Sequence, residues 1–122
     1  MPGNLFSFQD LQVWQKTIYY AEKVIRLIDL LKAPRKHFRL LEQMEAAATS
    51  IPMNIAEGKG RFSQKEFIHF LYIARGSLFE VITLLIIFRN LKWITEEKYK
   101  EMEQDGEEIT KMLNALIKSL KG

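Results

Sequence analysis

The segment from Gln64 to Leu91 constrains the fold most, because apolar residues cover nearly all of its circumference. Steps of four and three residues generate a first stripe: Phe67, Leu71, Ala74, Leu78, Val81, Leu85 and Phe88. A second stripe runs beside it: Phe70, Ile73, Ser77, Glu80, Leu84, Ile87 and Leu91. This spacing is typical of a helix packed among other helices. A helix that is apolar all round is buried all round, so we expect a core helix over 64–91 whose surplus apolar surface contacts another subunit.

Three amphipathic segments accompany this helix, over residues 7–32, 38–57 and 96–120. Pro34 is expected to end the first, because the residue before a proline disfavours the helical conformation. Thr95, followed by two glutamates, is expected to cap the start of the last. The links between segments are short, and short links join antiparallel neighbours. We therefore predict an all-α protein, a single domain over 1–122 folded as an up-down-up-down four-helix bundle.

The link between the second and third segments carries strong turn signals. Gly58 and Gly60 predict that a helix ends near residue 57 in a left-handed turn, a conformation that glycine adopts readily. Ser63 and Glu66 match a capping box, in which the serine hydroxyl accepts from the Glu66 amide and the carboxylate reaches back. A new helix should therefore begin at Ser63.

Two residues inside the predicted helices are unusual. Pro52 cannot donate to the carbonyl of Ala48, so the second helix should either kink there or restart with Ser50 as a cap, and we favour the kink. Gly106 weakens the fourth helix by about 1 kcal/mol, which indicates a close crossing with a neighbour.

Composition narrows the class of protein. The 122 residues include no cysteine, which excludes disulfides and thiolate metal sites and fits a reducing, cytoplasmic location. The N-terminus lacks a signal-peptide pattern, and the longest apolar run, 81–88, is far shorter than the roughly 20 residues that span a bilayer, so no membrane association is expected. The net charge of +3 is compatible with a polyanionic partner.

Basic residues sort to the two ends of the predicted bundle. The end with the first and third links carries the residues that we expect to bind nucleic acid: Lys32, Arg35, Lys36, Arg39, Arg89 and Lys92. The opposite end carries Lys59, Arg61, Lys65, Lys118 and Lys121. Phe62, Trp93 and Tyr19 are the aromatic residues expected to be exposed enough to stack on bases. Phosphate contacts through these loops would be electrostatic, with weak discrimination between sequences.

Four polar residues lie on or beside the apolar stripes: Asn54, Glu57, Ser77 and Glu80. An unpartnered buried carboxylate is costly, so we expect these residues to form a buried or interfacial polar network that serves structure rather than catalysis. Glu66 and His69 match the Glu-x-x-His spacing of di-iron bundles, but such a site needs a second motif and two further glutamates. We therefore expect no metal, no cofactor and no catalytic residue.

Several motifs together resemble a known family. They are Phe8–Gln15, Ser50–Gly58, Arg61, Ser63, Glu66–Phe67, Phe70–Leu71 and Ala74–Ser77. These residues resemble the four-helix-bundle proteins linked to 23S ribosomal RNA intervening sequences. The resemblance implies a left-handed bundle that assembles as a homopentameric ring. The chain is also similar to the accessory variability proteins of diversity-generating retroelements, which are thought to bind RNA and a reverse transcriptase.

One position departs from that family pattern. Similar members carry two basic residues after the glutamine equivalent to Gln43, where this chain has Met44, Glu45 and Ala46. The side of the second helix should then contribute little to RNA binding. The function expected is a non-enzymatic, oligomeric bundle that binds RNA or another nucleic acid through basic loops. A protein scaffold, for example an accessory factor for a reverse transcriptase, is the alternative, and a metal-dependent enzyme is less favoured.

Overall fold

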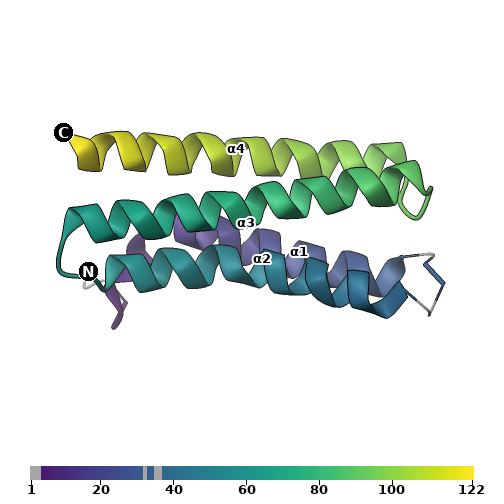
Figure 1. The fold of residues 1–122 in the computed structure, drawn as a ribbon, viewed down its shortest axis with the longest axis horizontal. Helices are drawn as coiled ribbons and strands as arrows, with labels where there is room; N and C mark the ends of the chain where they lie inside the picture. The colour runs from purple at the N-terminus through teal and green to yellow at the C-terminus, as the bar shows by residue number, and fades with distance from the viewer. Residues whose placement is uncertain (1–3, 32, 35–36) are drawn as a thin grey trace.

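The computed structural model describes residues 4–31, 33–34 and 37–122. A short 3-10 helix η1 (Ser7–Asp10) precedes four α-helices: α1 (Gln12–Leu30), α2 (Phe38–Lys59), α3 (Gln64–Asn90) and α4 (Glu96–Lys121). The described part of the chain contains no strand, so the all-α class with four helices is confirmed. The four helices lie lengthwise beside one another (Figure 1).

Cross-helix contacts give the relative directions of the helices. The contacting pairs are Lys16–Glu108 and Lys23–Glu101 between α1 and α4, Gln43–Glu80 and Ser50–Ser77 between α2 and α3, and Tyr72–Lys121 and Arg89–Tyr99 between α3 and α4. In each pair of helices, residue numbers rise along one as they fall along the other, so the partners run antiparallel. Each helix contacts two neighbours, and the diagonal pairs α1–α3 and α2–α4 make no close backbone approach in the described residues. The left-handed twist of the bundle stays a prediction.

The first apolar stripe of α3 is the centre of the core. All seven of its residues, Phe67 to Phe88, are buried, and they pack with buried side chains from the other three helices, such as Val24, Ile51 and Leu113. The second stripe is only partly buried. Leu84 is buried, but the side chains on the outward side of the stripe are exposed to solvent. By length and composition alone α3 is also apolar enough to cross a membrane, a property that core helices of soluble proteins share. Within one chain, α3 is therefore not buried all round.

The first helix is shorter than predicted. Residues 7–10 form the 3-10 turn and Leu11 is extended, so α1 begins at Gln12. The Asp10 carboxylate accepts hydrogen bonds from the backbone and side-chain nitrogens of Asn4, at 3.1 and 3.2 Å, and so does not cap the helix. At the other end the backbone of Leu31 is extended, so α1 ends at Leu30 and the proline at position 34 is not what ends it.

The glycines of the turn between α2 and α3 do not have the left-handed conformation that the sequence predicted. Gly60 has a φ of −81°, and Gly58 is a buried residue inside α2, so the left-handed turn near residue 57 is wrong. A Cβ on Gly58 would lie 2.7 Å from the Cβ of Phe70, so this glycine allows α2 and α3 to approach closely. The serine cap is confirmed, because the Ser63 hydroxyl accepts from the Glu66 amide at 3.1 Å. The returning bond from the Glu66 carboxylate is not formed in the described residues.

The end of α3 uses a left-handed residue that is not glycine. Lys92 has a φ of 62°, and its amide donates to the Arg89 carbonyl at 2.9 Å. The Trp93 amide donates to the Phe88 carbonyl at 2.9 Å, which completes a Schellman motif, and the two rings lie 5.3 Å apart. Two residues later Thr95 caps α4 as predicted, accepting at 3.0 Å from the amide three positions on.

The two unusual helical residues behave differently. Helix α2 continues through Pro52, so Ser50 does not cap a new helix, while the kink stays a prediction. At Gly106 a Cβ would lie 2.8 Å from Cδ1 of Ile82 and 3.3 Å from the Tyr20 hydroxyl, which confirms a close crossing of α4 with both neighbours.

Candidate nucleic-acid interface

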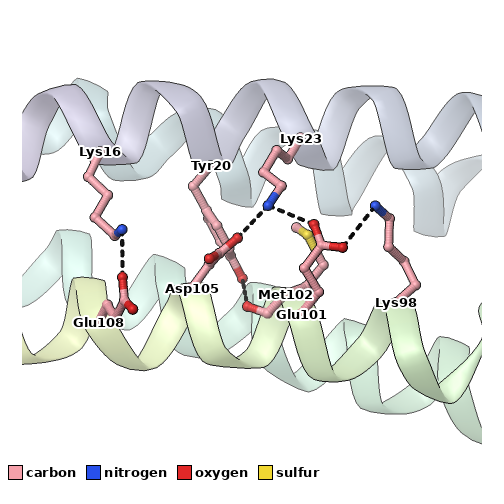
Figure 2. A network of polar contacts seen from close by, with 8 residues as sticks. All are labelled: Lys16, Tyr20, Lys23, Lys98, Glu101, Met102, Asp105 and Glu108. Carbon is pink, nitrogen blue, oxygen red and sulfur yellow. Dashed lines mark hydrogen bonds and ion pairs between the residues drawn. The ribbon is translucent and has the colours of Figure 1, made fainter.

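Ion pairs neutralise the lysines along the contact between α1 and α4 (Figure 2). The ammonium group of Lys16 lies 2.6 Å from the carboxylate of Glu108. The ammonium group of Lys23 lies 2.7 Å from Glu101 and 2.6 Å from Asp105. These carboxylates compete with any phosphate for the same cations, so this side of the bundle is a poor surface for a polyanion.

A buried tyrosine lies beneath these ion pairs. The Tyr20 hydroxyl donates to the carbonyl of Met102 at 3.1 Å. Burial, assisted by the negative charge of Asp105, raises the pKa of Tyr20 well above its ordinary value. The phenol therefore stays protonated and ties α1 to the backbone of α4 as a structural residue.

The ion pairs predict an acid-sensitive contribution to stability. The hydrogen bond from Lys23 lowers the pKa of Glu101, and the hydrogen bond from Lys16 likewise lowers the pKa of Glu108. A carboxyl group with a lowered folded-state pKa stabilises the fold above its unfolded-state pKa, about 4.3, and loses that effect as pH falls through the folded-state value. Glu101→Gln is therefore expected to melt below the parent at pH 7, with a difference that begins to shrink near pH 4.3 and vanishes only below the lowered folded-state pKa of Glu101. An equal difference in melting temperature at pH 7 and at acid pH would contradict this prediction. Glu42→Gln, at an exposed position of α2, is the control and should melt like the parent at both pH values.

The structure describes three of the six residues predicted to bind nucleic acid. Lys32, Arg35 and Lys36 lie outside the described residues. Arg39 is exposed in the first turn of α2, and Lys92 is exposed in the link before α4.

Arg89 is already engaged within the chain. Its guanidinium group lies 4.3 Å from the centre of the Tyr99 ring and 3.9 Å from the Glu96 carboxylate. Beside it a hollow of about 800 Å³ opens between the end of α1 and the start of α4. Its charged lining residues are Arg89, Lys92, Lys98, Glu96, Glu97 and Glu101. The described part of this end is therefore mixed in charge, and acids reduce the purely basic character that the sequence suggested.

The opposite end offers exposed basic residues beside an exposed aromatic ring. Lys59, Phe62 and Lys65 are all exposed around the turn between α2 and α3. Lys118 is exposed near the end of α4, and Lys121 donates to the Tyr72 hydroxyl at 2.8 Å. Sequence reasoning recognised these lysines but did not choose this end. The alternation of cations with an aromatic residue over 59–65 was the available signal.

Two of the four predicted polar residues share a network. The Asn54 amide donates to the carbonyl and hydroxyl oxygens of Ser50, at 2.8 and 2.9 Å, and the Ser50 and Ser77 hydroxyls lie 2.9 Å apart. Sequence reasoning missed Ser50, the residue that links the other two. Every described buried side-chain polar atom has a hydrogen-bond partner, so this partly buried network joins α2 to α3 at no cost in unpaired groups.

The two glutamates lie apart from that network. Glu57 pairs with Arg61 at 3.2 Å on the surface of α2. Glu80 is exposed and accepts a long hydrogen bond of 3.5 Å from the Gln43 side chain. The buried position expected for Glu80 does not exist within one chain, while an interfacial position stays a prediction.

Other candidate residues can also be placed. Trp93 is half-buried between Phe88 and His37, whose ring centres lie 5.3 and 5.1 Å away. The other two predicted stacking residues, Tyr19 and Phe62, are exposed. In the part of the chain that the structure describes, no group of three or more His, Asp or Glu residues is placed to hold a metal ion. Met44, at the position that departs from the family pattern, is fully buried in the core.

The fold and these surfaces define a four-helix-bundle protein with exposed cations at both ends. The chain matches the family model described as 23S rRNA-intervening sequence protein over residues 9–115, and it belongs to that family. The resemblance read from the motifs is thereby confirmed, while the relation to retroelement proteins stays a prediction.

A solved structure supports the same assignment. The chain is similar to a protein of unknown function from the S23 ribosomal protein family of Bacteroides thetaiotaomicron, with a TM-score of 0.80 and 31% identity. The match covers 87% of this chain and 95% of the other. No curated protein matches the sequence.

Proposed function

We propose that this chain is a non-enzymatic, homo-oligomeric protein that binds RNA through the ends of its bundle. The observation that carries the proposal is the distribution of exposed cations. The lysines facing the α1–α4 contact are paired with carboxylates. In the first and last helical turns and in the links, six exposed cations form no ion pair within the described residues: Arg39, Lys59, Lys65, Lys92, Lys118 and Lys121. Cations without carboxylate partners attract phosphate, and the family's link to 23S rRNA intervening sequences supports RNA as the polyanion.

Assembly is the second part of the proposal. Ile73, Ile87 and Leu91 lie on the second stripe of α3 and remain exposed in the single chain, on a helix otherwise central to the core. By contrast the exposed rings of Tyr72 and Phe79 are covered by cations, with the Arg75 guanidinium 4.9 and 5.9 Å from their centres. The uncovered aliphatic edge is therefore the surface that we assign to contact between subunits.

Repetition strengthens the charge argument. The resemblance implies a homopentamer, in which five copies of a +3 chain carry 5 × 3 = +15. Several weak phosphate contacts repeated around a ring act together, so a modest patch on one subunit becomes an effective binding surface.

RNA binding is expected to be strongly dependent on salt. Each phosphate neutralised releases condensed counterions, so affinity for RNA should fall steeply between low and moderate salt. Replacing Arg35, Lys36 and Arg39 together by alanine is expected to remove most of the binding at moderate salt while the oligomer stays intact. Filter binding with parent and triple variant measures the loss, and size-exclusion chromatography with light scattering monitors the assembly.

A charge-matched variant makes this test specific. Alanine at Arg26, Lys100 and Lys111 removes the same charge from exposed helix positions and should leave binding close to that of the parent. Equal losses in both triple variants would show that only net charge matters. If the parent shows no salt-sensitive RNA binding at low ionic strength, the RNA proposal fails, and a protein-scaffold role built on the exposed edge of α3 replaces it.

A further inference from the structure

The ring of Phe62 is fully exposed at the turn between α2 and α3. No aromatic or cationic group of the described residues stacks on it, although the rings of Phe67 and Phe70 nearby are both covered by cations. A scattered exposed apolar residue is ordinary by itself. Phe62 differs from a scattered exposed residue in two ways: hydrogen bonds fix the backbone around it, and positively charged side chains flank it.

The backbone around Phe62 is fixed on both sides. The Gly60 amide donates to the Ala56 carbonyl at 3.3 Å, and the Arg61 amide donates to the Gly58 carbonyl at 3.1 Å. On the other side of Phe62, Ser63 caps α3. The ring therefore extends from a preorganised turn, which lowers the entropy cost of binding a partner.

Arg61 belongs to the framework of the turn. Its guanidinium group lies 4.8 Å from the centre of the Phe70 ring and 3.2 Å from the Glu57 carboxylate. This contact uses Glu57, one of the two acids at the turn, so that it no longer opposes an incoming anion. Glu66, the other acid, is exposed in the first turn of α3, where its amide donates to the Ser63 hydroxyl.

Two lysines flank the exposed ring. Lys59 and Lys65 lie three residues before and three residues after Phe62, and both are exposed. The Lys59 ammonium group lies 5.9 Å from the centre of the Phe67 ring, and neither lysine forms an ion pair with the described residues. An aromatic ring between cations is the arrangement by which proteins hold single-stranded nucleic acid: a base stacks on the ring and the cations bind the adjacent phosphates. A protein partner that covered the Phe62 ring would need its own acidic residues to pair with the two lysines, or would have to leave both lysines in solvent.

We propose that this turn binds unpaired nucleotides of RNA, with Phe62 stacking on a base and with Lys59 and Lys65 contacting the neighbouring phosphates. The inference rests on the proposed function and adds a second contact, at the end opposite Arg39. It also assigns the class of ligand, because a base inside a duplex is not free to stack on a protein ring. The turn therefore distinguishes single-stranded from paired RNA.

The test compares a single strand with a duplex. An unstructured RNA of about 20 nucleotides and a duplex of the same length are titrated against the parent, Phe62→Ala and Phe62→Trp. Phe62→Ala is expected to weaken binding to the single strand by about tenfold and to leave binding to the duplex unchanged. Phe62→Trp should retain the affinity, and its added tryptophan fluorescence should be quenched on binding. Phe79→Ala, which removes an exposed aromatic side chain from the middle of α3, should match the parent.

The lysines are tested through the salt dependence. Lys59→Ala with Lys65→Ala should reduce the slope of log affinity against log salt by about 1.4 for the single strand, whereas Lys100→Ala with Lys111→Ala should not change it. If the parent binds RNA and Phe62→Ala binds the single strand equally well, this inference is overturned and the proposed function stands. A change in assembly size with unchanged RNA binding would reassign Phe62 to a protein contact. Failure of the parent to bind any RNA overturns the proposed function itself.

Discussion

Gly58→Val is expected to lower the free energy of unfolding by about 3 kcal/mol, the largest loss that a single substitution at a glycine of this chain should cause. A Cβ at this position would lie 2.7 Å from the Cβ of Phe70 and 3.3 Å from the backbone carbonyl of Phe67. Neither atom is the free end of a side chain, so α2 has to move away from α3. That movement would also disturb the core packing along the adjacent stripe.

Two other helical glycines provide matched controls. At Gly106 the nearest atom is Cδ1 of Ile82, the end of a flexible side chain, so Gly106→Ala should be close to neutral because a gain in helix propensity of about 1 kcal/mol offsets the adjustment. At Gly76 nothing lies within 4 Å, so Gly76→Ala should stabilise the single chain by up to about 1 kcal/mol. Denaturant unfolding at a fixed protein concentration measures all three. A smaller loss for Gly58→Val than for Gly106→Ala would contradict the close approach of α2 and α3.

Ile73→Asp with Ile87→Asp is expected to convert the assembled protein into single chains of about 14 kDa. These two residues are seven positions on either side of Glu80, so all three lie on one line along the outward side of α3. Each isoleucine is 38% exposed in one chain, so aspartate there costs the isolated bundle less than it would at a fully buried position. At a contact between subunits the same carboxylates would be buried without partners, which costs several kcal/mol at each copy.

Light scattering on a sizing column decides this prediction. Tyr19→Asp places the same charge on an exposed position of α1, a helix that makes no close approach to α3, and should leave the assembly size unchanged. Circular dichroism confirms that the double variant stays helical. A parent protein that elutes as a single chain at micromolar concentration would remove the basis for the proposed assembly, and an unchanged size in the double variant would place the subunit contact elsewhere.

The parts of the fold that could be predicted from sequence are those set by local chemistry. The hydroxyl caps at Ser63 and Thr95 depend only on a side chain and an amide three residues away, and both form as expected. The burial of the stripe from Phe67 to Phe88 was also predicted correctly, because the spacing of apolar residues along a helix indicates which side of the helix is buried.

The wrong predictions arise where one residue type is compatible with two different local structures. Gly58 near a helix end is equally consistent with a left-handed turn and with a close crossing, and only the position of Phe70 on the next helix decides between them. Lys92 gave no signal, since lysine is not favoured in the left-handed conformation, and the Schellman bonds and the contact between Trp93 and Phe88 hold it there.

The candidate site was harder to predict than the fold. The sequence shows how many cations each link carries but not which of them are already engaged. Arg89 lies over Tyr99 and Arg61 over Phe70, and both also contact a glutamate. The exposure of Phe62 and Tyr19 was predicted correctly, whereas Trp93 is half-buried, because the neighbours that cover it, Phe88 and His37, are brought together only by the fold.

The contact between α1 and α4 has a consequence for the order in which the chain folds. Lys23 and Asp105 are 82 positions apart in the sequence, whereas α2 and α3 meet through a turn of a few residues and pack most extensively. Bringing distant segments together costs more chain entropy than closing a short loop, so the α2–α3 hairpin is the natural nucleus and the α1–α4 contact closes last. Because that late contact is the least extensive of the four between neighbouring helices and includes ion pairs and one tyrosine hydrogen bond, the bundle should open there first.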